Sequence, residues 1–209
     1  MPYVPITRPS GITTHVSEAV NNLEEYYLKE VHCMLRLPLP NYRITSRCTF
    51  SCAQTLFSLV GGASTMLYAH RDSSPGKDFK DLLVDFYPWA DEPASRPTPT
   101  EGARIMYEQF RNPLAHNIGA HVRRRPSTPR VKIKRVRRSG SQAGPTEAFI
   151  EGLERGPRPD LSPAVIVRPG DATVLFVEPL YWGIRIMLKR LLEDSQRMIG
   201  AEAYLATVV

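Results

Sequence analysis

The residues whose types and spacing are best suited to chemistry lie in one short segment, Arg111-Asn112-Pro113-Leu114-Ala115-His116. An arginine guanidinium holds phosphate oxygens through a planar fork of donors, and a histidine imidazole exchanges a proton near neutral pH. Such a pair could cleave RNA without a metal. His116 would act as general base or acid while a 2′-hydroxyl attacks the adjacent phosphate. Arg111 would stabilise the charge that builds on the phosphate, Asn112 would orient His116 or the phosphate, and the products would be 2′,3′-cyclic phosphate and 5′-hydroxyl ends.

The geometry of this segment depends on the helix that is predicted to carry it. The helix is expected from about residue 101, with Thr100 as its N-cap. Pro113 lacks a backbone N–H and disfavours helical geometry at the preceding residue, so a kink or a restart is expected there. On an undisturbed helix, Arg111 and His116 would lie roughly 140° apart. A kink, the long arginine side chain, or a second motif from a symmetric partner could bring the functional groups together.

A structural interpretation of the same residues stays open beside the catalytic one. Arg111 would pair with a nearby acid such as Glu108, and His116 would be a satisfied structural histidine. A degenerate domain that binds RNA without cutting it is a further alternative.

The positive charge of the chain is concentrated in one run. The chain carries 27 Lys or Arg and 21 Asp or Glu, for a net charge of +6. Residues 122–138 hold nine of the basic side chains and no acid, which leaves 18 basic and 21 acidic residues elsewhere, a net of −3. Such a run suits a polyanion, here the RNA backbone, although a solvated loop is the alternative. The predicted nucleic-acid contacts are Arg123, Arg124, Arg125, Arg130, Lys132, Lys134, Arg135, Arg137 and Arg138.

The hydrophobic pattern predicts a mainly α fold. Apolar spacings of three to four indicate helices, and alternation or turn residues indicate strands. We expect four or five packed helices with a small β-hairpin insertion before the last helix, in a single domain over 1–209 whose basic, partly β insertion covers 122–177. The packed helices are expected over 12–35, 48–69 (central, apolar nearly all round), 77–87, 101 through the motif, and 178–205, and residues 143–155 could add a short one. A linker is expected at 88–99, a strand at 131–134, and a hairpin of 164–168 with 172–177 around Pro169-Gly170-Asp171.

The motif in its helical setting resembles the HEPN superfamily, whose members share an arginine, a polar residue and then a histidine after four to six intervening positions. The preceding Tyr107-Glu108-Gln109-Phe110 and the following Gly119 are also similar. The resemblance covers roughly 12–120 and 178–205 and implies a HEPN-like helical bundle and a two-fold dimer. It also implies a metal-independent endoribonuclease that acts as a toxin or antiviral defence effector, with Arg111, Asn112 and His116 as its active residues. A regulatory partner such as an antitoxin is possible. Members paired with nucleotidyltransferase antitoxins commonly have a tyrosine two positions after the histidine, where this chain has Ile118.

Cysteine usage and hydropathy set the remaining expectations. Three cysteines, Cys33, Cys48 and Cys52, indicate a reducing cytosol, and they lack the partners that a zinc site needs. The N-terminus has no apolar signal segment. The uncharged stretch 49–69 is diluted by polar residues and interrupted by Gly61-Gly62, so it is expected to be a buried helix rather than a membrane span. A cytoplasmic protein without metal, cofactor or membrane contact is expected.

Overall fold

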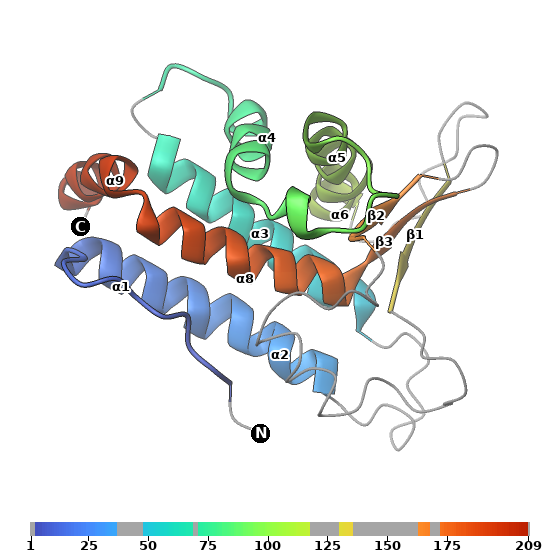
Figure 1. The fold of residues 1–209 in the computed structure, drawn as a ribbon, viewed down its shortest axis with the longest axis horizontal. Coiled ribbons are helices and arrows are strands. Elements are labelled where there is room, and N and C mark those ends of the chain that lie inside the picture. The colour runs from blue at the N-terminus through green and yellow to red at the C-terminus, as the bar shows by residue number, and fades with distance from the viewer. Residues whose placement is uncertain are drawn as a thin grey trace.

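The computed structural model describes residues 3–36, 48–68, 71–117, 130–135, 163–167 and 172–208, with the side chains of 116 and 117 left out. Within these ranges the protein is mainly helical, and a small three-stranded sheet covers one end of the helices (Figure 1). The predicted mainly α class is therefore confirmed. The predicted helix over 143–155 and the turn at 169–171 lie outside the described residues.

The N-terminal helical stretch runs without interruption from α1 (Thr14–Leu23) through a π-helical turn (Glu24–Leu28) to α2 (Lys29–Arg36). This confirms the helix predicted over 12–35. Its apolar positions recur every three to four residues, so they form one buried side, which includes Val16, Val20, Leu28, Val31 and Leu35.

Helix α3 (Thr49–Tyr68) is the centre of the molecule, as predicted. It contacts α2, α4, α6, α8, α9 and β1. The expectation that it is apolar nearly all round is wrong, because one side reaches the surface. Apart from Phe50 in its first turn, the exposed residues recur at helical spacing, namely Ser51, Gln54, Ser58, Gly62 and Thr65. Gly61 and Thr55, on the same side, are half-buried.

Helix α4 (Pro75–Phe86) packs on α3 and confirms the helix predicted over 77–87. The Ser74 hydroxyl caps it by accepting the Lys77 N–H at 3.3 Å. The predicted linker after it is partly packed: Trp89–Asp91 forms a 3-10 turn, and the buried Trp89 indole donates to the Leu83 carbonyl at 2.8 Å. This packing fixes the start of the next helix, which carries the motif.

The single final helix expected over 178–205 is wrong, because the chain breaks at Asp194. Helix α8 (Val177–Glu193) ends there, and α9 (Ser195–Val208) begins there in a new direction (Figure 1). Asp194 has φ −86° and ψ 89°, and its carboxylate accepts the Arg197 N–H at 3.1 Å. A short polar side chain that caps a helix in this way competes with continuation of the preceding helix.

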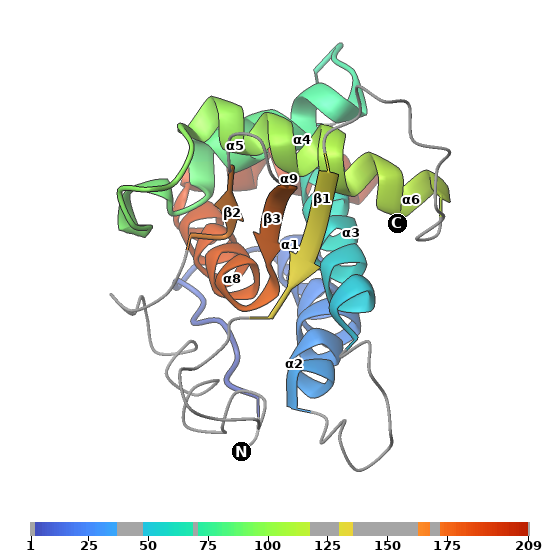
Figure 2. The ribbon, with the colours of Figure 1, turned by 90° about the vertical axis from the view of Figure 1, so that its right-hand side faces the viewer.

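The sheet has the strand order β1-β3-β2 and is seen from the end of the bundle in Figure 2. Strand β1 (Arg130–Lys134) runs parallel to β3 (Ala172–Phe176), and β2 (Val165–Ile166) pairs antiparallel with β3, with Val165 opposite Leu175. This pairing confirms the predicted hairpin arms and the strand predicted at 131–134. Strand β3 leads directly into α8, so the sheet and the helices share one hydrophobic cluster.

Candidate functional site

The motif lies on a continuous helical stretch made of α5 (Pro99–Ile105), a π-helical segment (Met106–Arg111) and α6 (Asn112–Asn117). The expectation that Thr100 is the N-cap is wrong. Thr98 is the N-cap, and its hydroxyl accepts the Glu101 N–H at 3.4 Å. Pro99 takes the first helical position because its fixed φ suits that position and its missing N–H is not needed there.

The sequence predicts a kink or a restart at Pro113, and this prediction is wrong. Asn112 keeps helical angles, φ −61° and ψ −50°. The change occurs one turn earlier, where Met106–Arg111 adopts the wider π-helical hydrogen bonding. A proline ring normally clashes with the carbonyl four residues before it, and a wider preceding turn relieves that contact. The local irregularity therefore ends at Arg111, the first residue of the motif.

Arg111 is half-buried and has no carboxylate partner among the described residues. Its guanidinium donates to the Asn112 side-chain oxygen at 3.2 Å and lies 5.6 Å from the centroid of the Tyr107 ring. The alternative pairing with Glu108 is not present, because Glu108 accepts a hydrogen bond from Arg104 at 2.7 Å. The positive charge of Arg111 is thus left available to an external anion.

Tyr107 supports Arg111, because its ring contacts the Arg111 guanidinium and also packs against α4. Its ring packs against Phe79 of α4, with centroids 5.4 Å apart, and Lys80 lies 5.6 Å from the same ring. A β-carbon at Gly76 would lie 2.3 Å from the Tyr107 hydroxyl, so this approach requires glycine in the first turn of α4. Tyr107 is therefore fixed by α4 on one side and contacts Arg111 on the other.

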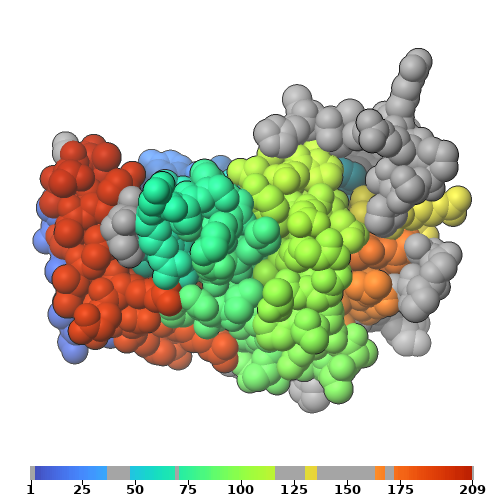
Figure 3. Space-filling model, turned by 90° about the horizontal axis from the view of Figure 1, so that it is seen from above, coloured from blue at the N-terminus to red at the C-terminus, as the bar shows by residue number. Residues whose placement is uncertain are grey.

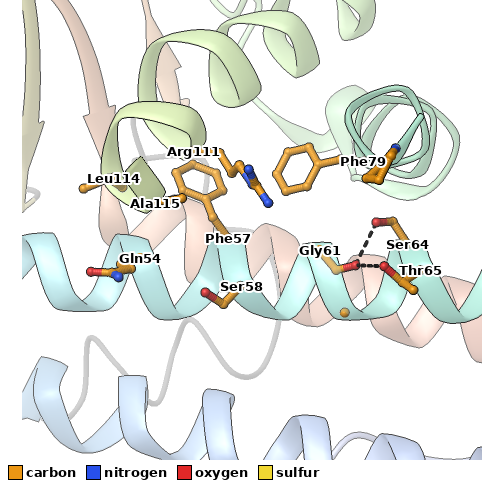
Figure 4. A pocket seen from close by; sticks show the side chains of 12 residues that line it. Gln54, Phe57, Ser58, Gly61, Ser64, Thr65, Phe79, Arg111, Leu114 and Ala115 are labelled. Atoms are coloured by element: carbon orange, nitrogen blue, oxygen red, sulfur yellow. Dashed lines mark hydrogen bonds between the residues drawn. The ribbon is translucent and has the colours of Figure 1, made fainter. Parts of the chain in front are cut away.

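Arg111 lines a cavity of about 410 Å³ between α3, α4 and α6, which we name the Arg111 cavity. Its side chain points toward α3, between the rings of Phe57 and Phe79 (Figure 4). In Figure 3, α4 and the α5–α6 stretch lie side by side on the surface above α3. The lining residues are Gln54, Phe57, Ser58, Gly61, Gly62, Ser64, Thr65, Pro75, Phe79, Arg111, Leu114 and Ala115.

Chemically, the Arg111 cavity combines one cation with polar and apolar walls. Among the described residues that line it, Arg111 alone is charged. The polar groups come from α3, and the apolar ones include two aromatic rings. A pocket of several hundred Å³ with apolar walls and a few convergent polar groups is typical of ligand sites. The cation favours a ligand that carries phosphate or another anion.

His116 lies on α6, one helical turn beyond Asn112, but its side chain is outside the described part of the chain. The meeting of the Arg111 and His116 functional groups therefore stays a prediction. The same holds for the basic residues Arg123, Arg124, Arg125, Arg137 and Arg138, which lie outside the described ranges.

Strand β1 presents three of the predicted nucleic-acid contacts at the surface. Arg130, Lys132 and Lys134 alternate along the strand and all three are exposed. Strand β1 and α6 both contact α3, and Figure 2 shows them on the same side of the molecule. Strand β1, with its exposed cations, and helix α6, with the end of the motif, are thus both supported by α3.

Arg135 has a different environment from its basic neighbours, and the expectation that it contacts nucleic acid does not hold. It is 7% exposed, and its guanidinium forms an ion pair with Glu178, which is fully buried. It also donates to the Leu35 carbonyl at 2.9 Å. A paired charge in this position joins the end of β1 to α2 and α8, and its burial keeps it from an external phosphate.

The other reactive side chains of the described chain do not form a recognisable centre. Burial raises the pKa of the Cys52 thiol to about 12, so the reactive thiolate is scarce at neutral pH. No group of three or more His, Cys, Asp or Glu in the described ranges could hold a metal ion. Among the described helices, none is long and apolar enough to span a membrane.

Comparison with family models, with curated proteins and with solved structures found no match to this chain.

Three features of the site were missed by the sequence reasoning. The contact of Tyr107 with Arg111 could have been predicted from their spacing, since residues four apart lie on one helix face. The polar side of α3 had a signal in the recurrence of Gln54, Ser58 and Thr65 at helical spacing. The close contact between Gly76 and Tyr107 joins separate elements, and nothing local in the sequence indicates it.

Proposed function

We propose that this protein is a metal-independent endoribonuclease that cleaves RNA by attack of a 2′-hydroxyl on the adjacent phosphate. The observation that carries the proposal is Arg111, a half-buried guanidinium without a carboxylate partner in the described chain, held at a cavity by Tyr107 and Asn112. A guanidinium held in place before the substrate arrives stabilises developing charge without reorganising during the reaction.

Within this proposal, each residue of the motif has one task. Arg111 binds the equatorial phosphate oxygens. Asn112 accepts a hydrogen bond from Arg111 and so restricts the guanidinium to one orientation. His116 takes the proton of the 2′-hydroxyl or gives one to the leaving 5′-oxygen. A second copy of the chain would complete the site across a two-fold axis, which supplies a second arginine and histidine.

The direct test is incubation of purified protein with RNA in EDTA. Wild-type protein is expected to cleave, and His116→Ala and Arg111→Ala are expected to lose at least about 100-fold in rate. Arg104→Ala is the matched control, because Arg104 lies on the same helical stretch but is occupied by Glu101 and Glu108. No cleavage by the wild type, or equal cleavage by His116→Ala, would overturn the proposal.

The dimer and the biological setting are tested separately. Light scattering is expected to give the mass of two chains, and a cleaving monomer would contradict the composite site. For a toxin or antiviral effector, expression in bacteria is expected to arrest growth, and His116→Ala is expected to abolish the arrest. An antitoxin or other regulatory partner would relieve the arrest when co-expressed.

A second candidate function is a non-catalytic RNA-binding or regulatory dimerisation module. The exposed cations of β1 favour it, since Arg130, Lys132 and Lys134 need no catalytic partner to bind phosphate. RNA binding that depends on these residues, in a protein that never cleaves, would select this function over the first.

A further inference from the structure

The wall of the Arg111 cavity has open space at Gly61, and no neighbouring side chain of the described chain needs a glycine there. A β-carbon added at Gly61 would meet no neighbouring atom within 4 Å. Glycine also weakens a helix relative to alanine, and Gly61 lies in the middle of the central helix. The chain thus keeps a small residue on the cavity wall where a larger one would fit and would favour the helix. At Gly61, unlike at Gly200, this space belongs to a cavity lined by a cation, so a ligand bound there could use it.

Two exposed polar side chains on the same wall have hydrogen-bonding groups that no described residue engages. The Gln54 amide and the Ser58 hydroxyl have no side-chain hydrogen bond within the described chain, and both line the cavity. By contrast, Ser64 and Thr65 donate to the Gly61 carbonyl at 2.9 and 3.1 Å, so only their acceptor lone pairs remain. An amide and a hydroxyl each offer a donor and an acceptor.

We propose that the Arg111 cavity holds the base of the nucleotide next to the phosphate that Arg111 contacts, and that Gln54 and Ser58 read the edge of that base. The nature of the ligand rests on the proposed function. A single-stranded nucleotide carries an anion beside a planar ring with donors and acceptors on its edge. The cavity offers the matching order of groups: a cation, apolar walls, and a donor–acceptor pair on α3.

This assigns base selection to the bundle rather than to the basic run. Residues 118–148 contain no Phe, Trp or Tyr on which a base could stack. The exposed lysines and arginine of β1 attract phosphate equally for every sequence. Gln54 and Ser58, on the opposite wall from Arg111, are therefore the specificity residues.

The test measures binding without cleavage, by fluorescence anisotropy with labelled 2′-fluoro pentanucleotides, which lack the attacking hydroxyl. The central base is varied through all four. Wild-type protein is expected to prefer one base by about tenfold. Gln54→Ala is expected to remove this preference, and Gly61→Leu is expected to weaken binding by about tenfold because it fills the cavity.

The controls are matched substitutions on α9. Gly200, like Gly61, is a helical glycine whose added β-carbon would meet nothing within 4 Å. Gly200→Leu and Gln196→Ala are expected to bind as the wild type does. Thermal melts are expected to show Gly61→Leu folded and at least as stable as the wild type. Equal affinity for all four bases, or unchanged binding by Gly61→Leu, would overturn the proposal.

Two further results separate the possible sources of the ligand and the two proposals. Competition by a free mononucleotide at or below the concentration of the pentanucleotide would assign the cavity to a free nucleotide and overturn the RNA assignment. Base-selective binding in a protein that never cleaves would reject catalysis and keep this inference. Cleavage by Gly61→Leu with the rate and base preference of the wild type would reject this inference and keep catalysis.

Discussion

At the scale of single residues, the site depends on how Arg111 is kept apart from acids. Arg104, on the same helical stretch, is held by Glu101 and Glu108 at 2.7 Å each. Arg111 instead contacts an aromatic face and a neutral amide, neither of which cancels its charge. These contacts fix the guanidinium while leaving the N–H groups that do not bond to Asn112 available to phosphate.

The role of Tyr107 gives the first prediction. Tyr107→Leu removes the aromatic face, and we expect RNA cleavage to fall about three- to thirtyfold, the range that a cation–π contact supports. Tyr107→Phe keeps the ring and should retain nearly full activity. The measurement is the single-turnover rate in EDTA, with a thermal melt for each variant. Equal rates for the Leu and Phe variants would show that Tyr107 does not position Arg111.

At the scale of elements, buried polar contacts hold the sheet and the helices together. The Arg135–Glu178 pair joins β1 to α8, and the Tyr87 hydroxyl and the Ala164 N–H both donate to Glu92, at 2.8 and 3.0 Å. Burial raises the pKa of Glu92, while these hydrogen bonds act against that shift. The small sheet is thus an integral part of the bundle at its described residues.

Breaking the Arg135–Glu178 pair gives the second prediction. Arg135→Met would remove the cation of the ion pair from the buried Glu178 carboxylate, and we expect the free energy of unfolding to fall by about 3–5 kcal/mol. Lys134→Met, on the exposed adjacent position, should change it by less than about 0.5 kcal/mol. Urea denaturation followed by circular dichroism measures both. A loss below about 1 kcal/mol for Arg135→Met would contradict the anchoring role.

The contact between α9 and the start of α1 gives a prediction about pH. The Glu202 carboxylate accepts hydrogen bonds from the Thr13 hydroxyl and the Val16 N–H, and it contacts His15 at 2.7 Å. The Thr13 hydrogen bond, then those from His15 and Val16, lower the pKa of Glu202 to about 2. Its folded pKa is below the unfolded value of about 4.3, so its stabilisation is present above that value and is lost as pH falls toward 2.

The melting temperature of wild-type protein should therefore exceed that of Glu202→Gln at pH 5, and the difference should shrink steadily as the pH falls through about 2. Glu18→Gln, at an exposed position on α1, is the control and should show no comparable change with pH. A Glu202→Gln difference that is the same at pH 5 and pH 2.5 would contradict this account.

The elements differ in how much of them the sequence could reveal. Helices α1–α2, α3 and α4 were predictable because their apolar spacing is strong and local. The break at Asp194 was missed because the apolar pattern continues past it, although an Asp that accepts the N–H three residues later is a local N-cap signal. The burial of Arg135 was hidden, since a charge run predicts solvent and its partner Glu178 lies 43 positions away.

At the scale of the whole molecule, two surfaces near α3 serve the proposed reaction. The Arg111 cavity lies between α3, α4 and α6, and the exposed cations of β1 lie on a strand that also contacts α3. The rest of the chain outside 122–138 has a net charge of −3, so the positive charge that the proposed RNA contact requires is concentrated in this run.

Localised attraction predicts a specific salt dependence. Replacing Arg130 and Lys134 with Gln should reduce the slope of log affinity against log salt by roughly 1 to 1.5, since each contact to single-stranded RNA contributes about 0.7. The same replacements at Lys29 and Lys189, on other parts of the surface, should leave the slope unchanged. Equal slopes for the two double variants would place the RNA elsewhere.

If Arg111 and His116 cleave RNA by 2′-hydroxyl attack, the product ends formed in EDTA identify the reaction. We expect 2′,3′-cyclic phosphate and 5′-hydroxyl ends with the wild-type protein. We expect these products to be absent with His116→Ala, and absent when the substrate lacks the 2′-hydroxyl at the cleaved position. Intact RNA with the wild type, products with 5′-phosphate ends, or the same products with His116→Ala would contradict this mechanism.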